Sequence, residues 1–157
     1  MIYIYNAGPL FSEAEVSQRK EEGRILDDIL CQSGKEYFIA NPIDLPFDNS
    51  KVLNSADIFG VDYNHINQSN AFFFELASGD TGTMVELGNV IEKYMNGKEM
   101  KIYPIFGDFR LQRNDVAGIE CPIGFNSYLV GALTYNKIPI YFSFQEAVEQ
   151  FKKDFDL

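Results

Sequence analysis

Residues 71–76 have the sequence Ala-Phe-Phe-Phe-Glu-Leu, an almost uninterrupted apolar run with the length of one strand. A run without polar alternation predicts a strand that is covered on both faces, as in the centre of a parallel sheet. Residues 78–83, Ser-Gly-Asp-Thr-Gly-Thr, follow it and are typical of a loop. We therefore take residues 71–76 as the central strand and place the other elements around it.

Short apolar segments and helical patterns alternate on both sides of this strand. Further strands are predicted at residues 2–5, 37–40, 102–106 and 138–141. Helices are predicted from the N-cap Ser12 to about Gly34, at residues 56–68, 84–95 and 125–135, and after the N-cap Ser143. This alternation predicts one α/β domain over residues 1–157, with an open, mostly parallel five-stranded sheet and helices on both faces, flavodoxin-like or Rossmann-like. Pro139 indicates that the last strand lies at an edge.

The composition narrows the class of partner. The chain has 157 residues, 23 acidic and 13 basic, for a formal net charge of −10. This acidity disfavours a nucleic-acid polymer, and no apolar run is long enough to span a membrane. Cys31 and Cys121 have neither a disulfide nor a metal-site pattern, so we expect a reducing, cytoplasmic location and no metal. The expected partner is small, and neutral or cationic.

Two acidic residues mark the loop after the central strand. In open parallel sheets the ligand crevice lies beyond the carboxyl ends of the strands, which directs attention to residues 6–11, 77–83 and the segment after Phe106. Asp80 and Glu86 are six residues apart, so both carboxylates can face one crevice. A helix N-terminus favours an anion, which predicts an ionised Glu86 suited to be a nucleophile. The alternative is that Glu86 caps its own helix and Asp80 only belongs to the loop.

Two segments together resemble the nucleoside 2-deoxyribosyltransferases. Residues 4–11, Ile-Tyr-Asn-Ala-Gly-Pro-Leu-Phe, contain the AGP-type turn that follows the first strand in that family. Residues 79–88, Gly-Asp-Thr-Gly-Thr-Met-Val-Glu-Leu-Gly, match the family's Asp-x-Gly-x-x-x-Glu-x-Gly segment. The resemblance covers nearly the whole chain and implies deoxynucleosides and free nucleobases as partners, with no cofactor.

The resemblance implies a role for each of several side chains. Glu86 is the expected nucleophile and Asp62 the acid that holds or protonates the base. Asp80 is expected to bind the 5′ end of the sugar, next to Gly8 of the AGP turn. Phe11 is expected to lie against the base.

The residue that orients the nucleophile is less clearly fixed. Tyr5 is the expected hydrogen-bond donor to Glu86, although the sequence leaves the choice between Tyr3 and Tyr5 open. His65 is the only histidine, and we expect it to be a surface or packing residue.

The resemblance also implies a shared active site. Asn126 matches an asparagine that reaches a neighbouring subunit's sugar site, with Tyr128 beside it. We therefore expect a homo-oligomer built from dimers, up to a hexamer. The alternative is that Asn126 is only a helix cap.

The predicted function is transfer of a 2-deoxyribosyl group between nucleobases, by a retaining double displacement through a glutamyl-deoxyribosyl intermediate. Two alternatives stay open: an N-glycoside hydrolase of deoxynucleoside 5′-monophosphates, and a non-catalytic nucleoside- or flavin-binding module. No Lys or Arg lies between Lys51 and Lys93, which disfavours a phosphate at this loop. The sequence does not distinguish purine from pyrimidine substrates.

Overall fold

The structure is a computed structural model that describes residues 1–45, 52, 54–112 and 123–157. Most of the loop expected over residues 44–54 lies outside the described residues. So does much of the segment 107–125, including Cys121. Cys31 is described, and it is exposed and free.

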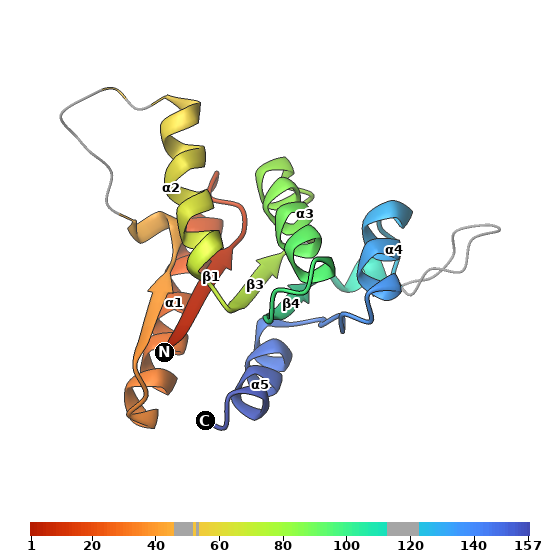
Figure 1. The fold of residues 1–157 in the computed structure, drawn as a ribbon. Helices are drawn as coiled ribbons and strands as arrows, with labels where there is room; N and C mark the ends of the chain where they lie inside the picture. Colours follow the sequence, from red (N-terminus) through yellow and green to blue (C-terminus); the bar gives the residue numbers. More distant parts are fainter. Residues whose placement is uncertain (46–51, 53, 113–122) are drawn as a thin grey trace.

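The sheet among the described residues has four parallel strands in the order β2-β1-β3-β4 (Figure 1). They are β1 (Ile2–Ala7), β2 (Tyr37–Ala40), β3 (Ala71–Glu75) and β4 (Lys101–Ile105). β3 pairs with β1 on one side and β4 on the other, so the prediction of a central strand at this place is confirmed.

The prediction of a fifth strand is wrong for the described residues. Residues 138–141 contribute one isolated parallel bridge, between Ile105 and Tyr141. Tyr141 donates to the carbonyl of Pro104 and accepts from the amide of Phe106. The next residue of the same orientation is Pro139, which has no N–H to donate, so the ladder stops there.

Helices connect the strands and begin close to the predicted residues. They are α1 (Glu13–Ser33), η1 (Pro42–Asp44), α2 (Ser55–Gln68), α3 (Thr81–Met95), η2 (Phe109–Gln112), α4 (Ser127–Tyr135) and α5 (Phe144–Asp154). The N-cap Ser12 and the left-handed C-cap Gly34 of α1 are confirmed. α3 begins at Thr81, three residues before the predicted start, because the carboxylate of Asp80 caps it.

Helices cover both faces of the sheet, as predicted. α2, α3 and α4 stand in a row on one face (Figure 1), with a core that includes Tyr5, Phe72 and Leu87. α1 and α5 cover the other face over Ile4 and Phe73, and residues 155 and 157 at the end of the chain pack against this second core. Within the described residues, no helix has the length and apolarity that a bilayer crossing requires.

Candidate active site

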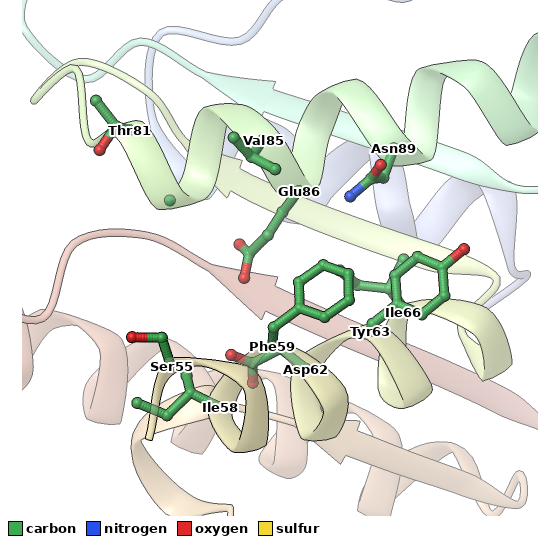
Figure 2. A pocket seen from close by; sticks show the side chains of 11 residues that line it. Ser55, Ile58, Phe59, Asp62, Tyr63, Ile66, Thr81, Val85, Glu86 and Asn89 are labelled. Carbon is green, nitrogen blue, oxygen red and sulfur yellow. The ribbon is translucent and has the colours of Figure 1, made fainter. Parts of the chain in front are cut away.

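A cavity of about 380 Å³ opens between α2 and α3, on the face of the sheet that carries Tyr5 (Figure 2). Its volume falls within the range of small-molecule sites. The lining residues come from both helices: Ser55, Ile58, Phe59, Asp62, Tyr63 and Ile66 of α2, and Thr81, Gly82, Val85, Glu86 and Asn89 of α3. Glu86 and Asp62 are 24 residues apart in the sequence and were predicted to serve one site. Both line the same cavity.

Glu86 is held by a tyrosine from the sheet. The hydroxyl of Tyr5 donates to Oε1 of Glu86 over 2.7 Å. Tyr5 is completely buried in β1, and burial is the main cause that raises its pKa, so the hydroxyl keeps its proton and acts as a fixed donor. Glu86 does not cap its own helix, because it is the sixth residue of α3 and its carboxylate binds Tyr5 instead.

The expectation that the helix N-terminus keeps Glu86 ionised is wrong. The pKa of Glu86 is raised from 4.5 to about 7, mainly by burial; the Tyr5 hydrogen bond lowers it, and the charges of Asp62 and Asp80 contribute to the rise. The dipole effect is confined to the first turn of a helix, and Glu86 lies beyond that turn. A carboxyl with a pKa near neutrality exists in both protonation states at physiological pH.

Asp62 faces Glu86 across the cavity (Figure 2). Its Oδ1 atom is buried and has no hydrogen-bond partner within the part of the chain that is described. Burial also raises the pKa of Asp62 to about 6. A buried acceptor without a partner costs free energy, so this atom is suited to a donor on a bound molecule.

Asp80 is not among the lining residues, although it directly precedes Thr81, and its side chain is used locally. Its Oδ2 accepts from the backbone N–H of Thr83 at 2.8 Å and from the Thr83 hydroxyl at 2.7 Å. The structure thus accounts for Asp80 as the N-cap of α3. Its charge still acts on Glu86, whose pKa it raises.

Gly8 is required by a buried arginine rather than by the cavity. A Cβ atom at Gly8 would lie 2.2 Å from Nη1 of Arg19, which is 2% exposed. Arg19 forms a 2.6 Å ion pair with buried Glu22 and donates to the carbonyl of Ala7 at 3.3 Å. Arg19 thereby holds the turn after β1 against α1.

Three other predicted residues lie outside the lining of this cavity. Phe11 is 83% exposed and is not among the residues that line the cavity. The side chain of Asn126 caps α4 by accepting from the amides of Tyr128 and Leu129. Tyr128 is 90% exposed, on a hollow between α3 and α4. Within one chain, Asn126 therefore acts as a helix cap, which is the alternative to a role in a neighbouring subunit's site.

Tyr3 and His65 form a separate contact. The Tyr3 hydroxyl lies 2.6 Å from Nδ1 of His65, whose ring stacks on Phe38. Tyr5 is therefore the tyrosine that contacts Glu86, and His65 is a packing residue as expected.

Sequence reasoning missed the walls of the cavity. Phe59 and Tyr63 of α2 stack with a centroid separation of 5.2 Å, and Val85 faces them from α3. The signal was available, because residues three or four apart share a helix face. Positions 58, 59 and 66 lie three or four residues from Asp62, and positions 82 and 89 lie three or four residues from Glu86. Positions 63 and 85 are in turn four residues from 59 and 89. In the described ranges, no cluster of three His, Cys, Asp or Glu is placed to hold a metal ion.

No model of a known protein family matches the chain. It is 30% identical over 122 residues to an uncharacterized protein of Ureaplasma parvum serovar 3, covering 73% of this chain and 77% of that protein. The chain belongs to the same family as this Ureaplasma protein. The relative's name states no activity.

Two solved structures share the fold. A conserved protein from Enterococcus faecalis has a TM-score of 0.71 at 20% identity, over 98% of this chain and 99% of its own. A 2-deoxyribosyltransferase from Leishmania mexicana has a TM-score of 0.64 at 21% identity, over 98% of both chains. At these identities the likeness establishes a common fold over nearly the full length.

Proposed function

We propose that this protein transfers 2-deoxyribosyl groups between nucleobases, with Glu86 as the nucleophile. The observation that carries the proposal is the hydrogen bond from Tyr5 to Glu86 in a cavity where the carboxyl of Asp62 stands opposite. A carboxylate that is held by one donor and leaves its second oxygen for a substrate is typical of an enzymatic nucleophile. The fold shared with the Leishmania deoxyribosyltransferase supports the same reaction class.

The reaction consists of two displacements at the sugar. A carboxylate oxygen of Glu86 attacks C1′ of a deoxynucleoside, the C1′–N bond breaks, and its electron pair leaves with the base. The base takes up a proton from Asp62 on the opposite side of the cavity. Because the pKa of Glu86 (about 7) lies above that of Asp62 (about 6), the reactive form with ionised Glu86 and protonated Asp62 is the less populated of the two singly protonated forms. An incoming base then attacks C1′ through nitrogen, returns a proton to Asp62, and releases Glu86 as a carboxylate. Two inversions retain the configuration, as in retaining glycosidases.

The electrostatics of the cavity fit a transition state with positive charge on the sugar. Within the described lining, there are carboxyl groups and no Lys or Arg. A buried anion stabilises developing positive charge more strongly than it would in water. The same lining gives a 5′-phosphate no cationic partner, which favours an unphosphorylated 5′-hydroxyl over the monophosphate substrate of a hydrolase.

We extend the proposal to a shared site in the cytoplasm. Exposed Tyr128 and Tyr135 lie on α4, Tyr128 close to the capping residue Asn126 and Tyr135 at the other end of the helix. A second copy of the chain that covers this surface would carry Asn126 towards a neighbouring sugar. Specific activity should then fall as the protein is diluted to monomers, and fully active monomers would refute the shared site.

Base exchange is the direct assay. The protein is incubated with deoxyinosine or thymidine and free adenine, and the products are separated by chromatography. Formation of deoxyadenosine supports transfer, release of free deoxyribose alone supports hydrolysis, and unchanged reactants support a binding module. Glu86→Ala is the matched control and should abolish exchange.

A further inference from the structure

Asn89 presents an unused amide to the candidate cavity. It lies one turn beyond Glu86 on α3 and lines the same cavity. Figure 2 shows its side chain extending from α3 towards the rings of Phe59 and Tyr63. In the part of the chain that is described, this amide forms no hydrogen bond, although it is partly buried.

We propose that Asn89 is a specificity-determining residue that reads the edge of the nucleobase and selects bases with an amino group beside a ring nitrogen, adenine foremost. This inference rests on the proposed function, since it assumes that the group opposite Glu86 is a sugar carrying a base. It goes further by assigning the class of base, which the sequence leaves open.

The order of side chains along α3 places the base near Asn89. Glu86 would bond to C1′ of the sugar, and Asp80 caps the helix six residues earlier. Three residues of helix rise correspond to about 4.5 Å, so Asn89 lies one base-ring length beyond the reacting carbon. The sugar would therefore lie towards Asp80, and the base would extend towards Asn89.

The wall opposite Asn89 is suited to a flat aromatic ring. Phe59 and Tyr63 stack within 5.2 Å at an interplanar angle of 16°. Lys93 donates to the Tyr63 hydroxyl at 3.1 Å and lies 4.6 Å from the centre of its ring, which ties this cation to the wall. Stacking positions a base without identifying it, so identity must come from polar groups.

The polar groups favour an amino substituent over an oxo substituent. An asparagine amide pairs with both the amino group and N7 of adenine, whereas the matching edge of hypoxanthine offers two acceptors. The unpartnered Oδ1 of Asp62 is a second acceptor in the same cavity. In the described lining, Asp62 and Glu86 are the ionisable acids and no basic side chain accompanies them. When Asp62 is ionised, an oxo group next to its Oδ1 would meet an acceptor, whereas an amino group there would donate to it.

The test compares adenine with hypoxanthine, which differ at position 6. Acceptor kcat/KM is measured in base exchange, and affinity of each free base is measured by equilibrium dialysis, which needs no turnover. The unchanged protein should prefer adenine by about 10-fold or more, because a good bidentate pair discriminates by roughly that factor. Asn89→Leu should lower this preference by about 10-fold, while Asn64→Leu on the exposed face of α2 should leave it as it was.

The outcomes distinguish a failure of the role proposed for Asn89 from a failure of the proposed transfer reaction. No exchange with any base, together with an adenine preference in dialysis that Asn89→Leu removes, would refute the transfer reaction and retain the role of Asn89. Exchange with an unaltered adenine preference in Asn89→Leu would refute the role of Asn89 and retain transfer. An unmodified protein without preference for adenine in either measurement would also overturn the inference.

Discussion

Replacing the proposed nucleophile should stabilise the protein at alkaline pH. Burial raises the pKa of Glu86 from 4.5 to about 7. The folded protein therefore binds this proton more tightly than the unfolded chain does, and stability is lost as pH rises from about 4.5 through about 7. The difference of about 2.5 pH units corresponds to about 3 kcal/mol at 1.36 kcal/mol per unit.

Glu86→Gln keeps the shape and removes the titration. Its free energy of unfolding, relative to the unchanged protein, should rise by about 3 kcal/mol between pH 4.5 and pH 8. Urea denaturation at several pH values measures this difference. Glu92→Gln, which removes an exposed carboxylate from the same helix, is the matched control for charge, and its change should be less than half as large. A Glu86→Gln difference that stays constant from pH 4.5 to pH 8 would refute the buried carboxyl on which the site depends.

Three further substitutions test the surroundings of Glu86. Tyr5→Phe removes a hydrogen bond that lowers the pKa of Glu86, so the acidic limb of the pH profile of kcat/KM should move up by about 1–2 pH units. Gly8→Ala places a methyl group against buried Arg19 and should cost about 1–3 kcal/mol in urea denaturation. Asn126→Ala removes the cap of α4 and should cost about 1 kcal/mol in the same measurement.

The first two of these substitutions have matched controls. Tyr3→Phe should leave the acidic limb in place, because Tyr3 contacts His65. Gly60→Ala should be neutral or stabilising, because nothing lies within 4 Å of the added Cβ in α2. An acidic limb that stays in place in Tyr5→Phe would contradict the first argument. Equal stability of Gly8→Ala and Gly60→Ala would contradict the second. An unchanged free energy of unfolding in Asn126→Ala would contradict the third.

The sequence sufficed for the elements whose pattern is local. The apolar run of β3 and the Ser12 and Gly34 caps of α1 are set by neighbouring residues, and the structure confirms them. The strand expected at 138–141 failed because a ladder needs a donor at each second residue, which Pro139 lacks.

The sequence was enough to predict which acidic residues form the site, but not how the fold changes their pKa values. Spacing and resemblance brought Tyr5, Asp62 and Glu86 to one place. The raised pKa of Glu86 depends on burial between α2 and α3, a tertiary property that a single helix pattern does not contain. Gly8 likewise looks like a ligand-binding glycine in sequence, and only the fold shows that Arg19 occupies its free side.

Mass spectrometry of the protein during reaction tests the central claim most directly. Incubation with a deoxynucleoside in the absence of an acceptor base should add the mass of one deoxyribosyl group, and peptide mapping should locate it on Glu86. Addition of free adenine should remove the added mass and yield deoxyadenosine. Glycosylated protein that accumulates equally in Glu86→Ala would contradict the account.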